Sequence, residues 1–142
     1  MLARVPKDRI RQLEAYEFFQ GVDATSAPVW TKEMAQRGAV FSNPGKCYRS
    51  TISYNAALKR YLWCQTLPGG DARFQGGFAI YDAPEPWGSW STVFYAKDWD
   101  VGPGETSSFP TKWMSADGKT LHLVFSGEDS FSIRGAALSL VP

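Results

Sequence analysis

The sequence predicts an all-β fold built from short antiparallel strands. Among the 142 residues, 15% are aromatic, and the chain contains 13 glycines and 9 prolines. This composition, with little that reads as long amphipathic helix, is typical of short strands joined by turns. Apolar runs also recur at short, even intervals with turn residues between them, which favours a meander over a parallel sheet with crossover helices. We therefore expect antiparallel four-stranded sheets within a single domain, residues 1–142.

The first 46 residues are the least regular part of the predicted fold. The stretch beginning DRIRQL predicts a helical turn that ends near Leu13, and AYEFF predicts a strand from Ala15 that ends in a turn at Gly21. The following GVDATSAPVWTKEMAQRG predicts a long irregular connection. Regular structure resumes after FSNPGK, because Asn-Pro-Gly strongly favours a turn.

Residues 47–99 predict one complete sheet of four consecutive strands. The four strands are YRSTISYN, RYLWCQT, GFAIYD and WSTVFYAK. Between the last two, YDAPEPWGSW places two prolines, two tryptophans and a glycine in one turn. Proline fixes φ and a buried ring covers a large apolar area. We therefore favour a structural role for this turn, with sugar binding as the alternative.

Residues 100–142 predict a second sheet of three strands, FPTKWMS, TLHLVFSG and SFSIRGAALSL. The link SADGKT has Asp-Gly at its centre, as a two-residue hairpin requires, so Asp117 is expected to serve the turn. One strand is missing from this sheet. The strand AYEFF has no other partner, and we expect it to complete the sheet.

Both sheets are expected to be covered on two faces. The segments LHLVF and STVFY are apolar at most positions instead of alternating with charged residues. Two arrangements satisfy this pattern: four-stranded blades of a β-propeller, or a sandwich of two sheets. The sequence leaves both open.

Composition and motifs exclude several function classes. A net charge of +1 gives no basic excess for nucleic acid or an anionic membrane. The start MLARVPKDRI carries a charge within four residues and no apolar segment, which predicts a cytoplasmic chain. No nucleotide fingerprint or Ser-His-Asp order appears, so no cofactor is expected. Cys47, Cys64 and His122 lack metal-ligand spacing, so no metal is expected, and a disulfide between the cysteines stays open.

Several separated segments carry a family resemblance. YDAPEPWGSW, STISYN, KRYLWC, GPGETSSFPTKW and SADGKTLHLVFSG resemble the C-terminal part of bacterial five-bladed β-propeller proteins of the sialidase-like or arabinanase-like glycoside hydrolase type. The resemblance runs from about Val5 to the end. In that family the turn often has proline where this chain has Ser89. The resemblance implies about two propeller blades, residues 47–99 and 100–142, from a family that is largely secreted.

The resemblance directs attention to carboxylates, because glycoside hydrolysis usually needs one carboxyl group as acid and another as base or nucleophile. Glu105 in GPGETSS is the best single candidate, since it precedes a strand expected to open onto the central channel and glycines beside it allow a ligand to approach. The alternative is a turn carboxylate that accepts local amide hydrogen bonds. No second acid is a clear partner.

Sugar-binding candidates come from aromatic and hydrogen-bonding side chains. Flat rings such as Trp87 and Trp90 stack on the apolar face of a sugar. Planar guanidinium groups bind hydroxyl or carboxylate oxygens, and neighbouring hydroxyls add hydrogen bonds. The candidates of these two kinds are Arg49, Arg134, Ser53 and Tyr54. For the arginines we favour a structural ion pair with Glu105 or Asp129 over sugar binding.

These expectations define three functional hypotheses. The first is a propeller-derived module that is not catalytic alone and binds carbohydrate, with self-association covering its outer faces. The second is a glycoside hydrolase whose site is assembled between chains. The third is a structural remnant without activity.

Overall fold

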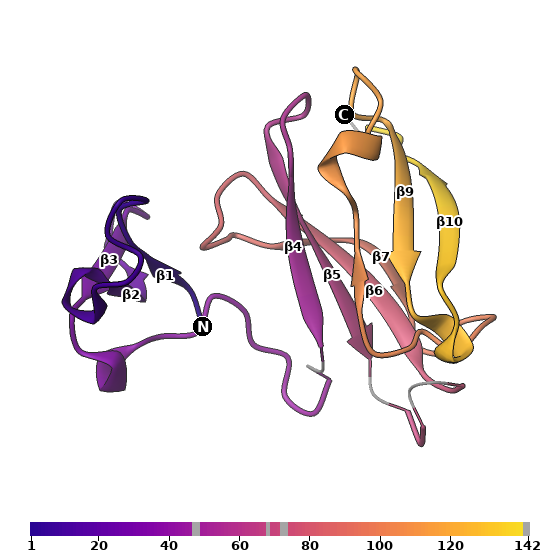
Figure 1. Ribbon diagram of the computed structural model, residues 1–142, viewed down its shortest axis with the longest axis horizontal. Coiled ribbons are helices and arrows are strands. Elements are labelled where there is room, and N and C mark those ends of the chain that lie inside the picture. Colours follow the sequence, from indigo (N-terminus) through magenta and orange to yellow (C-terminus); the bar gives the residue numbers. More distant parts are fainter. Residues whose placement is uncertain (47–48, 68, 72–73, 141–142) are drawn as a thin grey trace. The chain divides into compact units, whose positions relative to one another are not determined.

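The computed structural model describes residues 1–46, 49–67, 69–71 and 74–140 (Figure 1). It contains three antiparallel sheets of three or four strands, with short 3₁₀ turns between some of them. The predicted all-β fold class is therefore confirmed. The chain divides into two compact units, which we call unit 1 (Met1–Ser42 and Pro86–Gly88) and unit 2 (Asn43–Glu85 and Ser89–Pro142).

Unit 1 contains a small sheet of three strands in the order β1-β2-β3. Their bounds are β1 Ala3–Arg4, β2 Glu17–Val22 and β3 Pro28–Thr31. A 3₁₀ turn, Leu13–Ala15, precedes β2, near the predicted helical turn. Phe18 and Phe19 of β2 are buried.

The prediction that the N-terminal strand completes the last sheet is wrong. This strand forms β2 and pairs with β3, which lies within the stretch expected to be irregular. The reason is a tight turn at Asp23, whose carboxylate accepts the backbone N–H groups of Thr25 at 2.8 Å and Ala27 at 3.0 Å. Such an Asp side chain closes a turn and brings PVWT back onto β2.

The larger sheet of unit 2 has four strands in the order β4-β5-β6-β7, which confirms the predicted meander. Its strands are β4 Ser50–Asn55, β5 Arg60–Leu67, β6 Gly77–Ala83 and β7 Ser91–Ala96. Nearly every residue of β6 is buried, on both faces of the sheet. In contrast, β7 is an exposed edge strand.

The smaller sheet of unit 2 has the order β10-β9-β8. Its strands are β8 Ser107–Ser108, β9 Thr120–Phe125 and β10 Ser132–Ala137. The first of these was predicted at FPTKWMS, which is wrong, because Thr111–Trp113 forms a 3₁₀ turn and β8 lies before it. Pro110 explains the shift, since proline has no N–H to donate to a strand ladder.

The two sheets of unit 2 enclose one hydrophobic core between them. Leu62, Cys64, Phe78 and Ile80 come from the larger sheet. Residues of the smaller sheet and its flanking loop complete the cluster: Phe109, Leu121, Leu123 and Phe125. This packing also brings together the ends of β4 and β9, where polar groups meet.

At one of these ends the polar groups are fully paired. The buried amide of Asn55 donates from Nδ2 to the Gly118 carbonyl at 2.8 Å and accepts the Leu58 N–H at 3.2 Å. Gly118 has φ +71°, and a Cβ there would lie 2.4 Å from Oδ1 of Asn55, so only glycine fits. We call this contact the Asn55 junction.

Asp117 shapes the turn that enters the Asn55 junction, as predicted. Its carboxylate accepts the Ser115 hydroxyl at 2.6 Å and the Lys119 N–H at 3.1 Å. The hydrogen bond from Ser115 is the main reason that the pKa of Asp117 is lowered from its ordinary value.

Candidate functional site

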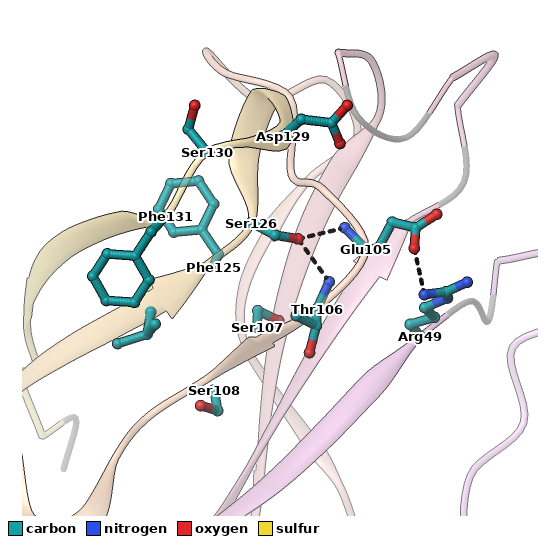
Figure 2. Close-up of a pocket in the computed structure, with 11 residues that line it drawn as sticks. Arg49, Glu105, Thr106, Ser107, Ser108, Phe125, Ser126, Asp129, Ser130 and Phe131 are labelled. Atoms are coloured by element: carbon teal, nitrogen blue, oxygen red, sulfur yellow. Dashed lines mark hydrogen bonds and ion pairs between the residues drawn. The ribbon is translucent and has the colours of Figure 1, made fainter.

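A groove of about 490 Å³ opens in unit 2 at the end of β4 and β9 opposite the Asn55 junction (Figure 2). It combines carboxylates, hydroxyls, a guanidinium group and aromatic rings. The residues that line it are Arg49, Glu105, Thr106, Ser107, Ser108, Val124, Phe125, Ser126, Asp129, Ser130 and Phe131.

Glu105 and Arg49, two of the predicted site residues, meet at this groove. Nη1 of Arg49 lies 2.5 Å from Oε2 of Glu105. The two side chains are 55% and 46% exposed, so the pair is open to solvent and contributes little to stability. This geometry agrees with the expected ion pair and leaves both groups accessible to a ligand.

The backbone that carries Glu105 is held by the loop after β9. The Ser126 hydroxyl accepts the N–H of Glu105 at 2.9 Å and that of Thr106 at 3.3 Å (Figure 2). Gly104 has φ +71°, and a Cβ there would lie 2.2 Å from the Ser126 carbonyl oxygen. The glycine before Glu105 is therefore needed for close packing of two backbones, and this packing fixes where the carboxylate begins.

Ser107 places an unpaired hydroxyl in the groove wall. The residue is 3% exposed, and within the described part of the chain its Oγ has no hydrogen-bond partner. Its carbonyl, in contrast, accepts the Thr51 hydroxyl. Buried polar atoms nearly always have a partner, so this hydroxyl, at a residue that lines the groove, is a candidate contact for a ligand.

The loop after β9 also supplies an acidic and an aromatic side chain. Glu128 and Asp129 both have positive φ, 52° and 56°, a conformation that costs non-glycine residues energy and is concentrated at functional sites. Gly127 starts this turn, because a Cβ there would lie 2.5 Å from the Phe125 ring. The loop leaves Phe131 75% exposed, with its ring beside the groove (Figure 2).

The two predicted tryptophans pack against other rings. Trp87 belongs to unit 1, where its ring meets Trp30 edge to face, with centroids 6.3 Å apart. Trp90 meets Trp63 edge to face at 5.0 Å in unit 2. Trp63 alternates along β5 with core residues, so this second pair lies on the face of the larger sheet that points away from the core.

Ser53 and Tyr54 lie on β4, along the strand from the groove. The Tyr54 ring is exposed and packs against Tyr61 with centroids 4.8 Å apart. Ser53 is half-buried. Among the described residues, Arg49 and Glu105 are the members of the predicted set that line the groove.

Arg134 lies on β10 and is bound by two neighbours. Its guanidinium carbon lies 4.5 Å from the centre of the Trp99 ring, and Nη1 donates to Oδ1 of Asp100 at 2.7 Å. This hydrogen bond is the main reason that the pKa of Asp100 is lowered. Arg134 therefore forms an ion pair with Asp100, a partner that the sequence did not predict.

The remaining reactive side chains do not form a cluster. Within residues 1–46, 49–67, 69–71 and 74–140, no group of three or more His, Cys, Asp or Glu side chains is arranged to hold a metal ion. Nδ1 of His122 lies 3.1 Å from the Trp113 carbonyl oxygen. Cys64 is a buried free thiol whose pKa is raised by burial. Cys47, the other cysteine of the disulfide considered above, lies outside the described residues.

Sequence reasoning missed Ser107, Ser126 and Phe131. Their signal is the pair of segments TSSF and FSGEDSF, in which small hydroxyl residues and acids stand beside a strand and are followed by an aromatic residue. Such segments at strand ends are typical of binding loops. The pairing of β8 with β9 then brings the two segments together.

Comparison with known proteins does not identify a function for this groove. No protein-family model matches the chain, and no curated protein is significantly similar to it. Across the described residues, none of the helical segments has the length and apolar character required to cross a membrane. The function is therefore inferred from the groove and from the sequence resemblance.

Proposed function

We propose that this chain is a propeller-derived module that is not catalytic alone and binds carbohydrate in the groove of Arg49, Glu105 and Ser107. The observation that carries the proposal is the unpaired, buried Ser107 hydroxyl in the same groove as the exposed Phe131 ring. A sugar offers both a hydroxyl for the first and an apolar ring face for the second. The resemblance to propeller glycoside hydrolases supports the same ligand class.

Each group in the groove has a part in binding a sugar. The Phe131 ring provides the flat apolar surface. Glu105 accepts hydrogen bonds from sugar hydroxyls, and the Arg49 guanidinium group donates hydrogen bonds to sugar oxygens. The Ser107 hydroxyl, which has no partner among the described residues, pairs with a sugar hydroxyl.

The setting of Glu105 supports binding without hydrolysis. A glycosidase needs one carboxyl group that is protonated and a second at a defined distance. The Glu105 carboxylate instead lies in an ion pair with Arg49, at an open surface. Such a setting supports hydrogen bonding to a ligand more than proton donation to a glycosidic oxygen.

A glycoside hydrolase whose site is assembled between chains remains the second candidate, and Glu105 and Asp129, which line the same groove, are the carboxylates that this chain would supply. A panel of aryl glycosides tests it. Turnover that is abolished by Glu105→Gln would establish the enzyme and overturn the non-catalytic proposal. Sugar binding without turnover would support the module.

The binding proposal is tested on a glycan array followed by calorimetry with a retained glycan. We expect Phe131→Ala to weaken binding about tenfold, since it removes the stacking surface. Ile133→Ala is the matched control, because Ile133 is an exposed apolar residue on β10 that is not part of the groove lining. An array without any retained glycan, or equal effects of the two variants, would contradict the proposal.

Self-association is part of the same proposal, with a second copy of the chain as the partner. Its support is β7, an edge strand without proline or charge that exposes Val93 and Tyr95. Such an edge is suited to pairing with another strand. Light scattering across a dilution series should show an oligomer that Val93→Lys converts to a monomer. A monomer at all concentrations of the unmodified chain would exclude it.

A further inference from the structure

A second hollow, of about 240 Å³, lies within unit 2 on the side where β7 and β10 form the sheet edges. Phe78 and Ile80 of β6 and Phe94 of β7 line it from the larger sheet, and Leu123 and Ala136 line it from the smaller one. None of these residues lines the groove of Glu105. The hollow is therefore a separate place in the molecule.

The lining of this hollow is strongly apolar and incompletely covered. Phe94 stands opposite Ile80 in the ladder, on the core side of the sheet, and yet it is 41% exposed. Apolar cavities of about 150 Å³ bind molecules the size of benzene. The hollow consequently has room for an aromatic ring or a short aliphatic chain, whose burial would cover the exposed part of Phe94.

The hollow also has a positively charged group in its lining. Among the described residues that line it, Arg134 alone is charged, and its side chain is 38% exposed. Its guanidinium lies over Trp99, and the Trp99 ring stacks on Phe78 with centroids 5.1 Å apart. Arg134 is thus held at a ring that is itself part of the apolar wall.

Asp100 shows which kind of group Arg134 accepts. Its carboxylate is 66% exposed and takes a hydrogen bond from Nη1 of Arg134 at 2.7 Å. A guanidinium group has five N–H donors and binds carboxylates in a planar geometry. A ligand carboxylate can therefore replace Asp100 or share Arg134 with it, while the apolar part of the ligand enters the hollow.

We propose that this hollow, which we call the Arg134 cleft, binds a small amphipathic carboxylate. The ring or chain of the ligand lies between Phe78, Phe94 and Ala136, and its carboxylate bonds to Arg134. Charge complementarity and the apolar lining select this class over sugars and over cationic ligands. Asp100 acts as an internal competitor for Arg134.

The first test compares two probes that differ only in charge, 3-phenylpropanoate and 3-phenylpropanamide, by titration of the ¹⁵N-labelled chain. We expect shifts of the Gly135 and Ala136 amide signals and about fivefold tighter binding of the acid, because its hydrogen bond to Arg134 is charge-assisted. Equal affinities, or shifts confined to Thr106 and Ser107 in the groove, would overturn the proposal.

Two variants locate the apolar part of the probe. Ala136 is half-buried on the core side of β10, and Ala137 is its exposed neighbour on the other face. Ala136→Leu fills the cleft and should weaken binding of the acid at least about tenfold, as the ring loses its space. Ala137→Leu adds the same atoms outside the cleft and should leave affinity unchanged. Similar affinities of the two variants would overturn the proposal.

The charged part is tested by removing the competitor instead of the arginine. Asp100→Asn removes the negative charge that lies beside Arg134. Because Asp100 is exposed, we expect the fold to stay intact. We expect about threefold tighter binding of the acid and no change for the amide. An unchanged affinity for the acid would show that its carboxylate does not use Arg134, and the proposal would fail.

Discussion

At one end of β4 and β9, the buried amide of Asn55 donates to the Gly118 carbonyl and accepts a backbone N–H. At the other end the Ser107 hydroxyl is almost equally buried but has no partner in the described residues, and a groove opens beside it. The same two sheets thus carry a buried polar group with partners at one end and a buried polar group without a described partner at the other. The difference predicts that Asn55 matters for stability and that Ser107 matters for the proposed ligand binding.

The largest effect on stability is expected from removing the paired group. Asn55→Ala leaves the Gly118 carbonyl and the Leu58 N–H without their partner inside the protein. We expect the free energy of unfolding to fall by about 2 to 4 kcal/mol. Urea unfolding followed by tryptophan fluorescence measures this loss, and a decrease below about 1 kcal/mol would show that the contact is not structural.

The ion pair at the open end should matter less for stability. A double-mutant cycle with Arg49→Gln and Glu105→Gln should give a coupling of about 0.2 to 1 kcal/mol, because both side chains are half-exposed. The coupling should also shrink as salt is added. A coupling energy as large as the loss of about 2 kcal/mol expected for Asn55→Ala would mean that the ion pair has a structural role.

The turn beside Asn55 should give a smaller effect that depends on pH. The pKa of Asp117 is lowered in the folded chain, so its stabilisation is present at neutral pH and is lost as the pH falls below the ordinary value of 3.8. The difference in Tm between the unmodified chain and Asp117→Ala should therefore shrink on acidification. Ser115→Ala, which removes the main hydrogen bond, should show the same trend; a constant difference would contradict it.

The smallest change in stability is expected at Ser107. Ser107→Ala removes a buried hydroxyl that lacks a partner, so the free energy of unfolding should stay within about 0.5 kcal/mol or rise slightly. Binding of the glycan retained on the array should weaken in the same variant. If Ser107→Ala instead destabilised the chain as much as Asn55→Ala, the distinction between the two ends would be lost.

Local patterns carried the prediction of the larger sheet. Strands β4 to β7 are neighbours in sequence and pair in sequence order, so turn residues and apolar runs were enough. The partner of β2 was missed because β3 is only four residues long and depends on the side chain of Asp23 to close its turn. The first strand of the smaller sheet was misplaced because Pro110 stops the ladder after two residues.

The candidate site divides in the same way. An ion pair of Arg49 could be expected from the sequence, with Glu105 or Asp129 as its partner, because opposite charges attract. The unpaired state of Ser107 could not, since it depends on which groups the folded sheets fail to bring within reach. The exposed position of Phe131 was missed as well, because the turn before it contains two consecutive residues with positive φ that the sequence did not predict.

The reactivity of Cys64 can report how often the core of unit 2 opens. Its thiol is fully buried between the two sheets, and burial raises its pKa, so in the closed state it has almost no reactive thiolate. In a Cys47→Ser background, a thiol reagent can modify Cys64 only in molecules whose sheets have separated. The labelling rate then reports how often the core opens, and comparing it for ligand-free and ligand-bound chains would show whether occupation of either hollow slows that opening.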